Sequence, residues 1–245
     1  MHVVVDATAG NGHDTVVLAR LLAQAGKGTL VACDVQNIAI ERTRDRLHSE
    51  LSGKAGWRFD SQRTAGWCEG DVSLKSAPPA VNVELRLSDH AELLEGLAPA
   101  SVSLIVFNLG YLPSGDKAIV TTAEGTIRAL RAAERCLRPG GCVSVTIYPG
   151  HGNVPPAHQT SRLDPHACVT LLVARAQVRF SLCALLAGFA GEGLREEGAI
   201  LEYAAALPQG RWSVHHTQWL NQRARKNAAI RAPSVLLIQC MNDGT

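Results

Sequence analysis

The sequence lacks an apolar run that could cross a membrane, because no stretch approaches about 18 uninterrupted apolar residues. Its N-terminus also lacks the charged, apolar and small-residue zones of a signal peptide. These absences argue against secreted and membrane-spanning classes, so we expect a soluble protein without a membrane partner. The expected location is the cytoplasm, or a chloroplast or mitochondrion if a transit peptide precedes these residues.

The cysteines lack the spacing of a metal or redox site. There are seven, an odd number, with no C-x-x-C pair and no zinc-ligand pattern. A reducing compartment fits this usage best, and we predict no metal site. Inert core packing is the expected role of the four that lie in or beside apolar segments, Cys33, Cys136, Cys142 and Cys240.

An excess of charge of one sign is also missing. The chain has 24 basic and 22 acidic residues, and a net charge of +2 is too small to indicate nucleic-acid binding. Residues 211–231 are the exception, because they hold five basic residues and no acidic one: Arg211, Arg223, Arg225, Lys226 and Arg231. This basic stretch is either a solvated face or a surface that contacts phosphate groups.

What the sequence does have is a regular alternation of strand-like and helix-like segments. Strands are predicted at residues 3–6, 29–34, 81–87, 102–108 and 142–148, and helices at 15–22, 38–51, 91–97 and 121–137. Strands separated by helices predict parallel β-α-β units, and so an α/β fold with a mostly parallel, doubly wound sheet of the Rossmann-like type. A chain of 245 residues can bury one substantial core, so we expect a single domain over residues 1–245.

The C-terminal part of the chain departs from this alternation. A helix is predicted at residues 194–207, and strands at 212–219 and 234–240 should form an antiparallel hairpin because no helix fits between them. Two stretches fit the plan poorly and are interpreted as insertions, residues 52–80 and 153–190. The second is an extra helix near residues 168–187, a poorly ordered segment or translated non-coding sequence.

The first predicted strand leads into a helix through Gly10-Asn11-Gly12. At such a turn the backbone can approach a ligand, and the N–H groups of the helix start can hold an anion. A dinucleotide fingerprint would have a third glycine at position 15, where this chain has Thr15. Because a β-branched side chain obstructs close approach to a pyrophosphate, NAD is the less favoured cofactor.

Acidic or amide side chains end four successive predicted strands, at Asp6, Asp34, Asp89 and Asn108. The carboxyl ends of parallel strands meet at one edge of the sheet, where ligands bind in such folds. An ionised Asp34 could accept hydrogen bonds from both hydroxyls of a ribose, and Asp89 with His90 could line an adenine. These features suit a nucleotide or S-adenosylmethionine (SAM) as the cofactor.

Residues 108–111, Asn-Leu-Gly-Tyr, follow the fourth of these strands. Methyltransferases that act on amino groups carry Asn or Asp, two small residues or prolines, and an aromatic at this place. The Asn108 oxygen could accept a hydrogen bond from an amine while Tyr111 packs over the acceptor. A strand that runs into a tight glycine turn with a packed tyrosine is the alternative.

Four segments in this order resemble one family of methyltransferases: residues 6–15 (DATAGNGHDT), 34–36 (DVQ), 107–117 (FNLGYLPSGDK) and 148–151 (YPGH). They are similar to the tRNA 5-(aminomethyl)-2-thiouridine methyltransferases of the MnmM type, long labelled putative rRNA methylases. The resemblance covers most of the chain outside the two insertions and implies a class I methyltransferase fold. The chain departs from the family in having fewer residues before the first strand and in the long segment at 153–190.

The resemblance implies that the cofactor is SAM and that the substrate is tRNA, modified in its anticodon loop. Methyl transfer to the aminomethyl nitrogen of a wobble uridine would give 5-methylaminomethyl-2-thiouridine. The expected cofactor contacts are Asp6, Thr8, Gly10, Asn11, Gly12, His13, Asp14, Asp34, Gln36, Asp89, His90, Asn108 and Leu109.

We further hypothesise that Asn108 and Tyr111 orient the amine, and that Asp116 or His151 receives its proton, directly or through water. The basic stretch would contact the tRNA backbone. Alternatives stay open because a fold does not fix a substrate. The chain could instead methylate a small-molecule amine or another RNA, or bind SAM without catalysis. The oligomeric state also stays open, with a homodimer as one alternative.

Overall fold

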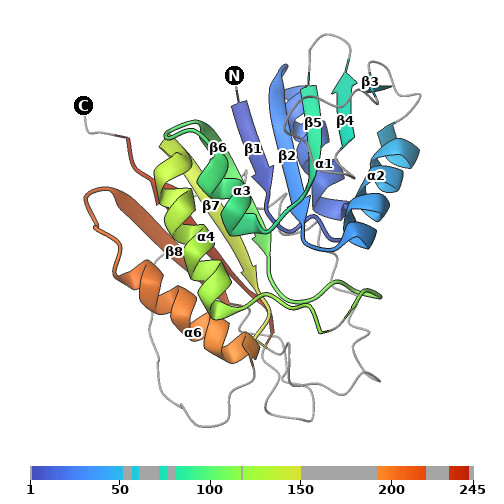
Figure 1. The fold of residues 1–245 in the computed structure, drawn as a ribbon. Coiled ribbons are helices and arrows are strands. Elements are labelled where there is room, and N and C mark those ends of the chain that lie inside the picture. The colour runs from blue at the N-terminus through green and yellow to red at the C-terminus, as the bar shows by residue number, and fades with distance from the viewer. Residues whose placement is uncertain are drawn as a thin grey trace.

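The computed structural model describes residues 2–51, 57–60, 72–76, 81–116, 118–149, 192–218 and 232–242. Five strands occupy the centre of its sheet: β1 (His2–Asp6), β2 (Gly28–Asp34), β5 (Val81–Leu87), β6 (Val102–Asn108) and β7 (Leu137–Ile147). They lie in the order β5-β2-β1-β6-β7, and every neighbouring pair is parallel. The predicted α/β fold with a mostly parallel, doubly wound sheet is confirmed (Figure 1).

Antiparallel pairs extend both edges of this central sheet. At one edge, β8 (Trp212–Gln218) and β9 (Ser234–Cys240) form the predicted C-terminal hairpin, with β9 paired to β7. At the other edge, β3 (Trp57–Asp60) and β4 (Val72–Ser76) form a second hairpin beside β5. The sequence did not predict these two short strands, because residues 52–80 show no periodic alternation of apolar and polar residues.

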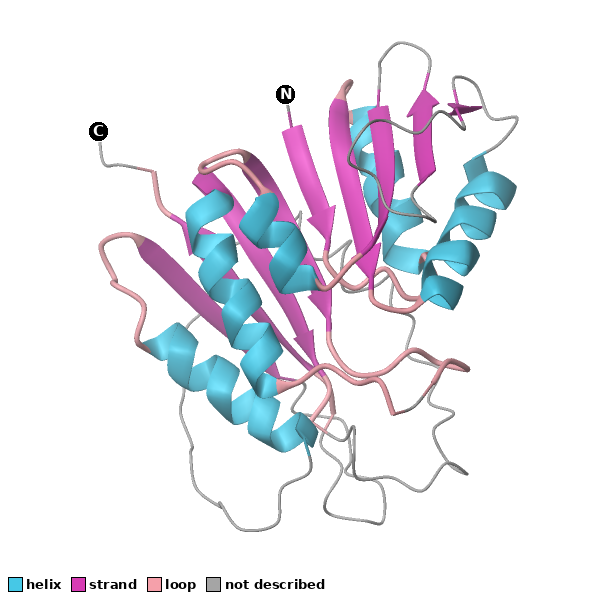
Figure 2. Cartoon of the chain, in the orientation of Figure 1, coloured by secondary structure: helices cyan, strands magenta, loops and turns pink. Residues whose placement is uncertain are grey.

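Helices cover both faces of the sheet, as Figure 2 shows. One face carries α1 (His13–Gln24) and α2 (Asn37–Leu51), and the other carries α3 (His90–Gly96), α4 (Ala123–Cys136) and α6 (Glu192–Ala205). Neighbouring strand residues alternate between the two cores: Val4 packs with the first pair of helices, and Val5 with the second group. None of the helices in the described residues has the length and apolar character to span a bilayer.

Helix α4 starts two residues later than the spacing predicts. A helix is expected from residue 121, but α4 begins at Ala123. The Thr122 hydroxyl accepts a hydrogen bond from Gly125 N at 3.2 Å and so caps the helix. A capping residue has an extended backbone and lies outside the helix, which explains the later start.

Strand β7 starts earlier than predicted, at Leu137 in place of residue 142. Leu137 pairs with Val102, and the next pair along the ladder is Cys142 with Leu104. The Pro-Gly-Gly turn at 139–141 therefore interrupts the ladder as an irregularity within one strand. The helix predicted over residues 121–137 ends at Cys136, directly before β7.

The strand order reverses at β1, because β2 lies on one side of it and β6 on the other. In doubly wound folds, ligands bind outside the carboxyl ends of the strands at such a reversal. Asp6 ends β1 and Asn108 ends β6. The fold thus brings these two predicted site residues to one edge of the sheet, toward which the arrowheads of β1 and β6 point (Figure 2).

Candidate active site

The turn between β1 and α1 contains two glycines with left-handed backbone, Gly10 at φ 56° and Gly12 at φ 78°. A Cβ atom at Gly12 would lie 2.7 Å from the Cα atom of Thr43 on α2. The Thr43 hydroxyl donates to the Gly10 carbonyl at 3.2 Å. The glycine turn is therefore shaped by the close packing of α2 as well as by any approach to a ligand.

Asp6 is buried at the carboxyl end of β1. Its carboxylate accepts hydrogen bonds from the Thr15 hydroxyl at 2.6 Å and from Thr8 N at 3.3 Å. Burial, with a smaller contribution from the charge of Asp14, raises the pKa of Asp6 to about 7. Thr15, whose side chain disfavours NAD, is thus also a direct partner of a predicted cofactor residue.

Asn108 is held from two sides at the carboxyl end of β6. Its backbone N–H donates to the Thr8 hydroxyl at 2.7 Å, and its Nδ2 atom donates to Asp14 Oδ2 at 3.2 Å. An ionised carboxylate only accepts hydrogen bonds, so the amide nitrogen faces Asp14 and the Oδ1 atom faces away from it. Among the described residues, no group donates to this oxygen. Asn108 therefore presents a hydrogen-bond acceptor beside the glycine turn.

Asp34 at the end of β2 connects the glycine turn to Gln36. Its carboxylate accepts hydrogen bonds from Gly10 N at 3.0 Å and from Gln36 N at 2.9 Å. Burial raises the pKa of Asp34, and backbone hydrogen bonds from Gln36, Gly10 and Val35 oppose the rise. A carboxylate has about four acceptor positions, so Asp34 keeps capacity to accept a hydrogen bond from a ribose hydroxyl.

Residues 109–116 and 118–121 lie in a loop after β6 that is closed at its base; we call residues 109–121 the acceptor loop. At its base, Gly110 N donates to Thr121 Oγ1 at 2.8 Å, and Thr121 N donates to the Gly110 carbonyl at 2.9 Å. Tyr111 and Val120 form an antiparallel bridge next to this pair. Gly110 has φ 131°, a conformation that residues with side chains rarely adopt, so the loop requires glycine at its base.

Arg42 on α2 joins the acceptor loop to the glycine turn. Its guanidinium donates to Asn11 Oδ1 at 3.3 Å and to the carbonyls of Pro113 and Ser114, both at 3.2 Å. Arg46 adds a 2.6 Å hydrogen bond from Nε to the Asn11 carbonyl. Sequence reasoning missed both arginines, because basic residues on a charged helix usually form a solvated face.

Asp116 lies close to Gln36. Its backbone N–H donates to Gln36 Oε1 at 3.2 Å, and its carboxylate accepts a hydrogen bond from Ala118 N at 2.9 Å. The side chain is exposed, and within the described parts of the chain no contact joins it to Asn108. Its role as the proton acceptor stays a prediction.

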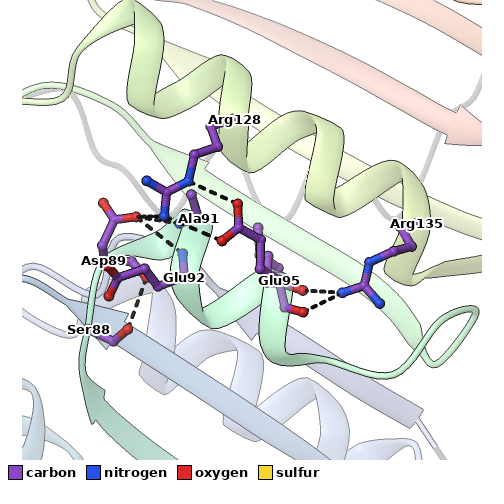
Figure 3. Close-up of polar contacts among 8 residues, drawn as sticks. Ser88, Asp89, Ala91, Glu92, Glu95, Arg128 and Arg135 are labelled. Carbon is purple, nitrogen blue, oxygen red and sulfur yellow. Dashed lines mark hydrogen bonds and ion pairs between the residues drawn. The ribbon is translucent and has the colours of Figure 1, made fainter.

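The side chains of Asp89 and His90 are engaged in the fold at the start of α3. Asp89 accepts a hydrogen bond from Ala91 N at 2.9 Å as the helix cap, and it lies 3.5 Å from the guanidinium of Arg128 (Figure 3). His90 is buried, and its ring meets Phe107 edge-on with the ring centroids 5.7 Å apart. Burial lowers the pKa of His90, which favours the neutral imidazole. Contact of this pair with an adenine stays a prediction.

The remaining predicted site residues are placed less fully. His13 begins α1 and is half-buried, Leu109 is buried, and Tyr111 is half-buried. His151 lies outside the described residues, as do residues 153–190 and the basic residues of 219–231. Arg211 is described, and its guanidinium lies 5.5 Å from the centre of the Trp212 ring.

Three carboxylates gather at this edge of the sheet: Asp6, Asp14 and Asp34. The charges of Asp14 and Asp34 both raise the pKa of Asp6, which places all three within electrostatic range. Such a set repels a pyrophosphate, whereas it attracts a ligand that carries an ammonium or sulfonium group. The carboxylates therefore fit SAM, which carries both cationic groups, better than a dinucleotide.

The family described as "Putative rRNA methylase" matches residues 30–156, more than half of the 245 residues of the chain. The chain belongs to this family. The match begins within β2 and includes β5, β6 and β7, and with them Asp34, Asn108 and the acceptor loop. The resemblance drawn from the sequence motifs is thereby confirmed.

A relative in Arabidopsis thaliana, the tRNA (mnm(5)s(2)U34)-methyltransferase, chloroplastic, is 34% identical over 153 residues. The alignment covers 60% of this chain and 47% of the relative, so this rRNA methylase family member matches about half the length of that curated protein. The name of this relative specifies tRNA as its substrate, and the sequence motifs led to the same expectation.

Two solved structures share the fold over nearly the whole chain. A putative rRNA-methylase from Clostridium thermocellum is 26% identical with a TM-score of 0.62, and the comparison covers 98% of this chain and 89% of that one. A putative methyltransferase from Streptococcus mutans in complex with SAH is 23% identical with a TM-score of 0.59, with the same coverage of both chains. The predicted class I methyltransferase fold is therefore confirmed for this rRNA methylase family member.

Proposed function

We propose that this chain is a SAM-dependent methyltransferase that N-methylates the 5-aminomethyl group of a wobble uridine or 2-thiouridine in tRNA. The observation that carries the proposal is the orientation of Asn108, whose Nδ2 atom is bound to Asp14 and whose Oδ1 atom is available to an N–H donor. This acceptor lies at the strand reversal, beside the glycine turn. The name of the Arabidopsis relative supports tRNA as the substrate.

The residues at the carboxyl edge fit SAM as the cofactor. When bound, SAM supplies an electrophilic methyl group on a positively charged sulfur. Asp34 would accept hydrogen bonds from the ribose hydroxyls, and Asp6 with Asp14 would attract the cationic groups. Asp89, His90 and Leu109 would line the adenine, and residues 10–13 with Thr8 would hold the rest of the cofactor.

The amine must lose a proton before or during the transfer. A primary alkyl amine resembles lysine, with a pKa of ~10.4, so ~4.6 kcal/mol separates it from its neutral form at neutral pH. Asn108 Oδ1 would accept one N–H and direct the nitrogen lone pair toward the methyl group, while Tyr111 packs over the base. Asp116 or His151 would take the proton, directly or through water.

The anticodon loop suits such a site as a substrate. A base in a single-stranded loop can be turned out of its stack and bound in a pocket at little cost in base pairing. The basic residues of 211–231 would contact the phosphate backbone, and this contact would add to the affinity without reading the sequence. The chloroplastic designation of the relative supports an organellar location as an alternative to the cytoplasm.

The proposal is tested by mass spectrometry of the nucleosides of tRNA that carries 5-aminomethyl-2-thiouridine, before and after incubation with the protein and SAM. We expect loss of this nucleoside and gain of its singly methylated form. Methyl incorporation into a metabolite extract but not into tRNA would support a small-molecule amine as the substrate. A folded sample that binds no SAM in calorimetry would show that the chain does not use this cofactor.

A further inference from the structure

Helix α6 places a buried carboxylate at the base of the acceptor loop. The side chain of Glu196 has no exposed surface. Its Oε1 atom accepts a hydrogen bond from the Thr126 hydroxyl at 2.5 Å, and its Oε2 atom accepts one from the Thr121 hydroxyl at 3.0 Å. Helices α4 and α6 lie side by side in Figure 1, so one carboxylate connects α6, α4 and the end of the acceptor loop.

A carboxylate is a costly group at this position. Burial raises the pKa of Glu196 to about 7; the charge of Glu192 one turn earlier adds to the rise, and the two threonine hydroxyls oppose it. Elsewhere α6 packs against the sheet through apolar side chains such as Ile200 and Ala204. A residue of that kind would avoid the desolvation of a charge, so stability alone does not account for Glu196.

The Thr121 hydroxyl gives this carboxylate an effect on the acceptor loop. A hydroxyl has one hydrogen to donate, and Thr121 donates it to Glu196. Its lone pairs are thereby directed to Gly110 N, which donates to them at 2.8 Å. Gly110 lies between Asn108 and Tyr111, the two residues assigned to orient the amine. The orientation of one hydroxyl thus fixes the peptide that links them.

We propose that Glu196 is a positioning residue for methyl transfer, which acts through Thr121 to hold Gly110 and thereby the segment from Asn108 to Tyr111. The catalytic consequence rests on the proposed function, whereas the effect on the order of the loop does not. Glu192 on the same helix accepts a hydrogen bond from Ala123 N at 3.1 Å and, among the described residues, makes no hydrogen bond to the acceptor loop, so it provides a matched comparison.

The test compares Thr121→Val and Glu196→Gln with the controls Thr122→Val and Glu192→Gln. Thr122 and Glu192 each bond the start of α4, so the controls report the general effect of weakening that helix end. Two quantities are measured for each protein: the steady-state kinetics with tRNA at saturating SAM, and hydrogen–deuterium exchange of residues 109–116 without ligand.

Thr121→Val and Glu196→Gln are expected to lower kcat about tenfold, the effect of one hydrogen bond lost from the reacting geometry, with SAM affinity changed less than about twofold. They should also speed exchange in residues 109–116. Thr121→Ser keeps the hydroxyl and should restore both quantities. The two controls should change kcat by less than about twofold and leave this exchange unaltered.

Equal exchange and equal kcat in all variants would overturn the positioning role and leave Glu196 as a packing residue. A wild-type protein that methylates no tRNA would refute the proposed function instead. In that case the exchange comparison still decides whether Glu196 and Thr121 hold the loop, because it needs no substrate.

Discussion

The Thr15 hydroxyl donates to the carboxylate of Asp6 at 2.6 Å within the core, where both residues are almost fully buried. This hydrogen bond lowers the pKa of Asp6 against the larger effect of burial. It therefore supports the charged form of a group that lies under the glycine turn. Loss of the hydroxyl should affect both the stability of the fold and the ionisation of the site.

Thr15→Val is expected to lower the free energy of unfolding by about 1–3 kcal/mol, because it leaves a buried carboxylate oxygen without its hydroxyl donor. Thr15→Ser, which keeps the hydroxyl, should lower the free energy of unfolding by a smaller amount. Urea unfolding at pH 8 measures both. A valine variant as stable as the serine variant would show that the hydrogen bond contributes little.

Glu196 should make the protein less stable as the pH rises. Its pKa is about 7 in the folded protein and 4.5 for an ordinary glutamate, so between these values the folded state binds more protons than the unfolded state. The contribution of Glu196 to the free energy of unfolding is greatest below pH 4.5. It falls by up to about 1.4 kcal/mol per pH unit as the pH rises toward about 7. Above the higher value there is no further loss.

The measurement is urea unfolding of wild type and Glu196→Gln at several pH values between about 4.5 and 7. The free energy of unfolding of wild type minus that of the variant should decline as the pH rises across this interval, because the amide of the variant does not titrate. Two curves that stay parallel would indicate that Glu196 keeps an ordinary pKa in the folded protein.

Asn108→Ala should lower kcat with tRNA about 100-fold at saturating SAM, because the amine loses the acceptor that orients it. The Asp14 carboxylate would also lose the donor that it contacts at 3.2 Å. Binding of SAM measured by calorimetry should fall much less than kcat. If SAM affinity fell sharply while kcat at high cofactor concentration matched wild type, Asn108 would be a cofactor residue and not an acceptor for the substrate.

Arg42→Lys should loosen the acceptor loop, because a lysine cannot reproduce the guanidinium hydrogen bonds to Asn11, Pro113 and Ser114. A loss of about 1 kcal/mol, or roughly fivefold in affinity for SAM, is expected from these partly exposed hydrogen bonds. Arg44→Lys serves as the control, since Arg44 pairs with Asp45 on the exposed side of the same helix. Equal affinities in the two variants would contradict the assignment of Arg42.

Charge reversal of Arg223, Arg225 and Lys226 together should weaken binding of tRNA and reduce the dependence of that binding on salt. The plot of log K against log salt concentration has a negative slope, and each phosphate contact that is lost should reduce the magnitude of this slope by about 0.7 to 0.9. Filter binding or fluorescence anisotropy over a range of salt concentrations gives this slope. An unchanged affinity and slope would assign the basic stretch to a solvated face.

The sequence predicted the parts of the site that follow from the sheet. Strand ends meet at one edge in a parallel sheet, so Asp6, Asp34 and Asn108 could be grouped from their positions alone. In the structure, hydrogen bonds connect Asn108 to Thr8 and Asp34 to Gly10. These contacts also depend on the strand order β5-β2-β1-β6-β7, which the succession of strands and helices does not specify by itself.

The contacts made by helices could not be predicted in the same way. Arg42 and Glu196 are ordinary charged residues on helices, and only the packed structure shows that they reach the acceptor loop. Glu196 and Thr121 are 75 residues apart in the chain, and no local pattern connects such a pair. The edge strands β3 and β4 were missed for a related reason, since short strands carry too few residues to show a period.

The close approach of Gly12 to Thr43 couples helix α2 to the glycine turn. No residue of α2 is predicted to touch the cofactor, yet its backbone leaves no room for a side chain at Gly12 of the turn. A shift of α2 toward the turn should therefore displace the turn as well. The atom in contact is a backbone Cα, which cannot move aside as a flexible side chain can. Substitutions on the buried face of α2, at Ile40 or Leu47, should then appear as kinetic defects in a site that these two residues do not contact.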